Sequence, residues 1–115
     1  MFRTKSDMVG ERAWKIEWWT MTEEQRVYVL QGGELDHEEL TDNFIILHGV
    51  NFDQACEQSA KIIEKHEKQM YWYSTRIHLV EYAVEIADDG FLDYDWKTID
   101  EPVEYNKGEW MPENF

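Results

Sequence analysis

The sequence predicts a small α+β domain in which one amphipathic helix packs on one face of a small antiparallel sheet. Several short segments alternate apolar and polar residues with a period of two, as half-buried strands do. One longer segment, residues 52–69, repeats its apolar residues with the period of a helix. The chain has 115 residues, of which 15% are aromatic, and this is enough material for a folded core.

We expect a single domain whose folded core is residues 12–98. Residues 1–11 are polar and are expected to form a loose lead-in, and residues 99–115 are expected to form an acidic, partly ordered tail. The sequence contains no apolar run of the roughly 18 residues that a membrane span needs, and its first residues lack a signal-peptide core. Its single cysteine fits a reducing compartment, so we expect a cytoplasmic protein.

The first two strands are expected at residues 14–19 and 26–31. Residues 14–19 alternate large apolar side chains with polar ones, which is the strand period. Residues 26–31 are β-branched and aromatic, which favours a strand. Thr22 and Gln25 also fit a capping box, so a helix that begins there is the competing interpretation.

A third strand and the helix are expected after an acidic connection at residues 34–43. Residues 43–48 form a short apolar run, which indicates a more central strand. Asn51 is then placed to cap the helix at 52–69, and Gln54 is placed to return the hydrogen bond.

A hairpin is expected to complete the order β-β-β-α-β-β. Residues 78–86 alternate, and the same alternation resumes after an Asp-Asp-Gly turn in which Gly90 takes the left-handed conformation. The predicted register places one set of apolar pairs on the face expected to meet the core: Ile86 with Leu92, Val84 with Tyr94, and Tyr82 with Trp96.

The chain is strongly acidic, with a formal net charge of -14. The C-terminal third carries most of this imbalance, since residues 77–115 hold eleven acidic and two basic residues. Direct binding to nucleic acid or to an anionic membrane requires Lys/Arg patches, so neither is expected. The charge favours a basic protein surface as the partner.

No pattern in the sequence indicates catalysis, a cofactor or a metal. The four histidines lie on four different predicted elements and have no zinc-ligand spacing. The paired carboxylates of the hairpin alternate away from the aromatic face, so they should be exposed and keep ordinary acidity. There is no phosphate-binding loop and no nucleophile motif. We therefore expect a non-enzymatic protein without a cofactor or metal.

The expected function is that of an inhibitor or adaptor that docks on a basic, nucleic-acid-binding surface of a partner protein. Such small, acidic, tryptophan-rich domains without motifs are typical of virus-encoded proteins that block a host factor, some of which imitate the phosphate pattern of DNA. The expected contact residues are hairpin carboxylates, a second acidic group and two aromatic residues: Glu81, Glu85, Asp88, Asp89, Asp93, Asp95, Glu34, Asp36, Glu38, Glu39, Trp72 and Tyr73.

Two alternatives remain open on the sequence alone. The acidic face of the hairpin could be a solvated surface without a binding role. Charges on an edge strand also protect a sheet against aggregation, which would explain their presence. The alternative function is that of a structural or assembly protein, which forms a homo-oligomer through an edge strand and the unplaced aromatic residues.

Overall fold

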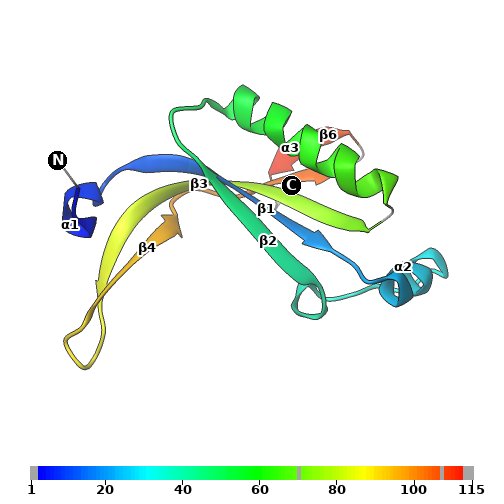
Figure 1. The fold of residues 1–115 in the computed structure, drawn as a ribbon, viewed down its shortest axis with the longest axis horizontal. Coiled ribbons are helices and arrows are strands. Elements are labelled where there is room, and N and C mark those ends of the chain that lie inside the picture. Colours follow the sequence, from blue (N-terminus) through cyan, green and yellow to red (C-terminus); the bar gives the residue numbers. More distant parts are fainter. Residues whose placement is uncertain (1–2, 70, 107, 113–115) are drawn as a thin grey trace.

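The computed structural model describes residues 3–69, 71–106 and 108–112. Within them, six antiparallel strands form one sheet and the long helix α3, Phe52–Lys68, packs on one of its faces (Figure 1). The strand order is β2-β1-β3-β5-β6, and β4 also pairs with β3. The α+β class with one main helix is thus confirmed.

The sheet is organised around the long strand β3, Trp72–Ile86. One of its edges pairs with β1, Arg12–Thr20, which in turn pairs with β2, Thr41–Leu47. Its other edge is shared by two strands, β5 (Val103–Asn106) near its start and β4 (Leu92–Thr98) near its end. The strand β6, Glu109–Pro112, pairs with β5 at the edge of the sheet.

Helix α3 begins and packs as its sequence predicts. The Asn51 side chain accepts from the Gln54 amide at 2.8 Å, and the Gln54 side chain accepts from the Asn51 amide at 2.9 Å. The helix buries a stripe of small and apolar residues, with Ile63 only 3% exposed, against β1 and β3. Ile16 and Ile77, which lie opposite each other in register, are fully buried on this side of the sheet.

A second group of side chains is buried on the face opposite α3, because the sheet is strongly curved (Figure 1). His48 directly follows β2 and Trp96 lies in β4; although β1 and β3 separate these strands, the two rings are 5.3 Å apart between centroids. Inside this curve, Val80 is fully buried and Ala13 is 4% exposed. Both faces of the central strands therefore contribute to the core.

The predicted strand at residues 26–31 is wrong, because the chain forms helix α2, Glu23–Leu30. The capping box is present: the Gln25 amide donates to the Thr22 hydroxyl at 3.2 Å, and the Gln25 side chain accepts from the Thr22 amide at 2.9 Å. No described strand pairs with this segment, and Leu30 is 65% exposed. The local caps therefore outweigh the β-branched composition.

Four further elements lie where no secondary structure was predicted. A one-turn helix α1, Lys5–Met8, lies in the predicted lead-in, and a 3-10 turn η1, His37–Glu39, lies in the acidic connection. The predicted tail contributes β5 and β6, whose register pairs Tyr105 with Trp110 and brings their rings to 5.1 Å. Residues 113–115 of that tail lie outside the described residues.

No helix in the described residues combines the length and apolar character needed to cross a bilayer.

Candidate protein-binding surface

The C-terminal hairpin has the predicted register and turn. The strands β3 and β4 pair Ile86 with Leu92, as expected, and the same register continues through Val84–Tyr94 and Tyr82–Trp96. The Ala87 amide donates to the Phe91 carbonyl at 2.9 Å, which closes the three-residue loop. Gly90 has φ of 83°, in the left-handed region that favours glycine.

The outer part of this hairpin, residues 83–95, projects from the body of the protein and is called the hairpin arm below (Figure 1). The last residue of β3 that pairs with β1 is Glu81. One residue further, the Gly10 amide donates to the Tyr82 carbonyl and the Tyr82 amide donates to the Glu11 carbonyl, and the contact of this edge ends there. Beyond that point β3 pairs with β4 alone. The arm is therefore a two-stranded ribbon without a covering layer among the described residues.

One face of the hairpin arm is apolar and exposed, which corrects the expectation that it meets the core. The buried part of this face ends at Tyr82, which is 8% exposed. Beyond it the apolar side chains of this face are open to solvent, since Val84 is 39%, Ile86 74% and Leu92 54% exposed. The alternation predicted the correct side for these residues but not the absence of a layer over them.

The other face of the arm carries the predicted carboxylates. Between residues 83 and 95 there are five acidic residues and no basic residue, and all five are exposed: Glu85, Asp88, Asp89, Asp93 and Asp95. Glu85 lies directly opposite Asp93, as predicted. Because like charges across a strand pair are unfavourable, this arrangement opposes folding slightly.

The ion pairs at the base of the arm do not follow the strand register. Glu81 lies opposite Lys97 in register, but its carboxylate contacts Arg12 at 3.5 Å. The Lys97 ammonium instead contacts Glu85 at 3.3 Å. One of the five arm carboxylates is therefore partly neutralised, and Glu81, which is half-buried, belongs to the base of the arm.

The second predicted acidic group lies around η1 and is separate from the hairpin arm. Its four carboxylates, Glu34, Asp36, Glu38 and Glu39, are all exposed. Figure 1 shows the segment between α2 and β2 far from the hairpin tip along the long axis of the molecule. Glu39 also has a structural role, because its side chain accepts from the Asp36 amide at 3.2 Å. The structure therefore does not bring the two acidic groups into one surface.

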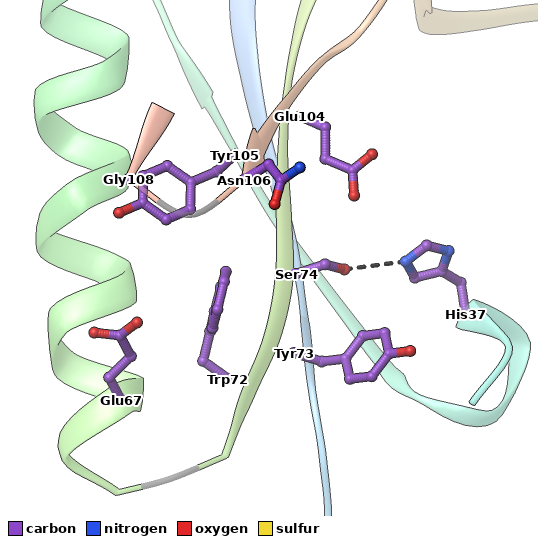
Figure 2. Close-up of a pocket in the computed structure, with 9 residues that line it drawn as sticks. All are labelled: His37, Glu67, Trp72, Tyr73, Ser74, Glu104, Tyr105, Asn106 and Gly108. Carbon is purple, nitrogen blue, oxygen red and sulfur yellow. Dashed lines mark hydrogen bonds between the residues drawn. The ribbon is translucent and has the colours of Figure 1, made fainter. Parts of the chain in front are cut away.

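Trp72 and Tyr73 also lie away from the hairpin arm. Both are half-buried, and both donate hydrogen bonds: the Trp72 indole to the Thr75 hydroxyl at 2.7 Å, and the Tyr73 hydroxyl to the Leu35 carbonyl at 3.1 Å. They line a pocket of about 660 Å³ near η1 (Figure 2). This pocket had no signal in the sequence, because it combines segments that are far apart along the chain.

The wall of the pocket includes a serine–histidine contact. His37 Nε2 lies 3.0 Å from the Ser74 hydroxyl, and the His37 ring packs on Trp19 with 4.3 Å between centroids (Figure 2). Such a contact can activate a serine when the hydroxyl is accessible to a substrate. Ser74 is only 8% exposed, so the contact mainly fixes the position of the imidazole.

A titratable cluster lies on the same face of the sheet as His37. His78 Nε2 is 3.0 Å from the Glu17 carboxylate. Burial alone would raise the pKa of Glu17, but hydrogen bonds with His78 and Asp42, together with the charge of Lys15, lower it to about 2. Burial, then the hydrogen bond and negative charge of Glu17, raise the pKa of Asp42 to about 6. A protonated Asp42 can thus donate to the Glu17 carboxylate.

Among the described residues there is no group of histidine, cysteine and carboxylate side chains that could hold a metal ion. Burial, followed by the charge of Asp53, raises the pKa of the Cys56 thiol to about 11, so this cysteine is a protonated, unreactive thiol.

Comparison with known proteins gives no match for this chain among family models, curated proteins or solved structures.

Proposed function

We propose that this protein is a non-enzymatic binding protein, an inhibitor or adaptor in the cytoplasm, that uses its hairpin arm to dock on a basic, nucleic-acid-binding surface of a partner protein. The observation that carries the proposal is the arm itself, which combines five exposed carboxylates on one side and at the turn with exposed large apolar side chains on the other. The proposal needs no cofactor.

The charge of the arm supports a basic partner. Exposed carboxylates compete for arginine and lysine groups that otherwise hold phosphates, and charge-assisted hydrogen bonds of this kind are among the stronger polar contacts. Electrostatic complementarity also accelerates encounter with a partner and disfavours wrong ones. A surface that binds nucleic acid through its phosphates supplies the required clusters of basic groups.

The apolar side of the arm supports a protein rather than a small ion as the partner. Ile86 and Leu92 lie opposite each other and are 74% and 54% exposed, so they add little to the stability of the free protein. Contiguous exposed apolar groups with a polar rim are typical of protein–protein contact sites. We therefore expect the partner surface to place an apolar groove beside its basic groups.

The proposal is tested with a charge reversal on the arm and a matched reversal elsewhere. The test variant is Glu85→Lys with Asp93→Lys, and the control is Glu24→Lys with Glu57→Lys, which changes the net charge equally at exposed positions on α2 and α3. Each immobilised protein is exposed to lysate at low salt and eluted with a salt gradient. Proteins retained by the parent and the control but lost from the test variant support the proposal, and equal retention by all three contradicts it.

The alternative of a homo-oligomer also has one observation in its favour. The strand β2 is at the edge of the sheet, and it exposes Phe44 at 58% and Ile45 at 36%. Such an edge is a template for pairing with a second copy. Light scattering separates the two proposals: an aromatic, edge-strand dimer persists at high salt, whereas an electrostatic complex dissociates.

A further inference from the structure

The pocket near η1 opens where two neighbouring strands separate. The register of β5 on β3 covers only Arg76 with Glu104 and Ile77 with Val103. Toward Trp72 the strands diverge, and the space between them, the end of α3 and η1 has a volume of about 660 Å³. This lies within the range of small-molecule sites, roughly 300–1,000 Å³.

Three aromatic side chains form much of the pocket lining: Trp72, Tyr73 and Tyr105 (Figure 2). The Trp72 and Tyr105 rings are nearly perpendicular, with an interplanar angle of 79° and 6.0 Å between their centroids. The Tyr105 ring also packs against Trp110. The indole N–H of Trp72 and the hydroxyl of Tyr73 are already used in hydrogen bonds. What these two side chains offer a ligand is therefore mainly their ring faces.

Two carboxylates, Glu67 and Glu104, also line the pocket. In Figure 2 the Glu67 carboxylate lies beside Trp72 on the helix side, and Glu104 lies on the other side of β3. No lysine or arginine is among the described lining residues. The nearest arginine along β3 is Arg76, opposite Glu104 in register, whose guanidinium lies over the Trp19 ring at 5.0 Å. Arg26 lines a neighbouring hollow that shares Glu67 and Trp72.

The aromatic rings and the carboxylates together favour a positively charged ligand. Aromatic ring faces carry negative charge density and attract ammonium and guanidinium groups, more strongly where water is excluded. The two carboxylates repel an anion, and a neutral ligand would leave them without a charged partner when it displaced water. A flat cation can satisfy a ring face and a carboxylate together, because a guanidinium stacks on aromatic faces and donates in a fork to a carboxylate.

We infer that this pocket binds an organic cation, a guanidinium or ammonium group on a short alkyl chain, against its aromatic rings, where the two lining carboxylates attract the positive charge. The side chain of an arginine on another protein and a free alkylguanidine share this chemistry. The site lies away from the hairpin arm, shares no residue with it, and does not rest on the function proposed for the arm.

The first experiment compares charged and neutral probes of the same shape. The full-length protein is titrated at low salt with acetyl-arginine methylamide, with its neutral analogue acetyl-citrulline methylamide, and with butylguanidine, and amide NMR shifts are recorded. We expect saturable shifts around Trp72 and Glu104 with the arginine probe, and affinity about tenfold above that of the citrulline probe. Absence of saturation with both cations, or equal affinity for the citrulline probe, overturns the inference.

The two sources of the cation are separated by the third probe. If the pocket takes a chain-borne arginine, the acetylated and amidated probe binds at least as well as butylguanidine. If the pocket takes a free cation, the backbone groups of the peptide probe reduce affinity and butylguanidine binds more tightly. Both results support a cation site and identify its source.

The second experiment assigns the binding to the pocket carboxylates. Glu67→Gln and Glu104→Gln are each expected to weaken arginine-probe binding several-fold, while Glu57→Gln removes the same charge from an exposed position on α3 outside the pocket and is expected to leave it unchanged. Glu67 is exposed on the helix, so Glu67→Gln tests the site even if Glu104→Gln disturbs the sheet. An equal loss in Glu57→Gln would show that only the overall charge attracts the probe and contradicts the inference.

The hairpin variant Glu85→Lys with Asp93→Lys tests whether the pocket binds its probe independently of the hairpin arm. It is expected to bind the arginine probe as the parent does. The hairpin proposal and the cation pocket can therefore fail separately, because each has a variant that leaves the other site unchanged.

Discussion

The two halves of β3 are both rich in apolar side chains but have opposite surroundings. In the first half, up to Val80, the strand pairs with β1 on one edge and, at Arg76 and Ile77, with β5 on the other, and Ile77 and Val80 are fully buried on opposite faces. In the second half the apolar positions on the face of Val80 continue into the hairpin arm, where Ile86 is 74% exposed. An alternating pattern thus reports which side of a strand is apolar, and the neighbouring elements decide whether that side is a core or an open surface.

The largest expected effect comes from truncating the same residue type in both halves. Ile77→Ala should lower the free energy of unfolding by about 2–5 kcal/mol, because it leaves a cavity in a packed core. Ile86→Ala should lower it by less than about 0.5 kcal/mol, since it removes mostly exposed surface. Denaturant unfolding of both variants checks this. Similar losses at the two positions would mean that the arm is packed like the body of the sheet.

A smaller effect is expected at the turn that closes the arm. Gly90→Val should destabilise by roughly 1 kcal/mol or more, because a β-branched residue resists positive φ. A Cβ at this position would meet no atom within 4 Å, so any loss comes from the backbone conformation alone. The control is Gly90→Asn, which tolerates this conformation better and should retain most of the stability. If the melting midpoints of both variants equal that of the parent, the turn is not held in the conformation described here.

The charges of the arm should change stability by only a few tenths of a kcal/mol. Asp93→Lys replaces repulsion of Glu85 by attraction and is expected to be neutral or mildly stabilising. Glu85→Lys relieves the same repulsion but loses the contact with Lys97, so it should be neutral or mildly destabilising. Thermal melting at low and high salt checks both signs, since added salt should bring the two variants together. A large loss in either variant would mean that the acidic face is part of the folded core.

The smallest effect is expected from Asp42 beside the first half of β3, and it depends on pH. The pKa of Asp42 rises from 3.8 to about 6 on folding, so its contribution to stability is complete below 3.8 and is lost as pH rises through about 6. Asp42→Asn should therefore gain in melting temperature relative to the parent between about pH 5 and about pH 8.

Glu17, in the same cluster, contributes to stability with the opposite dependence on pH. Its pKa falls from 4.5 to about 2 on folding, so its contribution is present above 4.5 and is lost as pH falls through about 2. Glu17→Gln should melt below the parent at neutral pH. If Glu17→Gln melts as high as the parent at about pH 5, where Asp42 is protonated, the two carboxyls do not share a proton as described.

What could be predicted from the sequence follows from the range of the interactions involved. Helix α3 and the hairpin register depend on residues close together in the chain, such as the Asn51–Gln54 caps and the turn at Gly90, and both were predicted correctly. Helix α2 was predicted only as the competing interpretation, because its β-branched residues favour a strand and its capping box favours a helix. The strands β5 and β6 were missed because four-residue strands in a segment with proline and glycine give a weak pattern.

The candidate sites show the same limit. The acidic residues of the arm were identified from local alternation, and their exposed position is as expected. The exposure of the apolar face was not predicted, because it depends on where β1 ends relative to β3. The aromatic pocket depends on the divergence of β3 and β5 and on the placement of η1 beside them, which no local pattern indicates.

The central claim is that the hairpin arm is separate from the folding core and carries the binding function. Residues Ala83 and Asp95 lie opposite each other, so replacing residues 84–94 by Asn-Gly joins them through a two-residue turn. The most direct test measures melting and partner retention on this one shortened protein. The shortened protein is expected to melt within a few degrees of the parent and to lose the proteins that the parent retains. Retention of the same proteins without the arm, or collapse of the fold, would contradict the central claim.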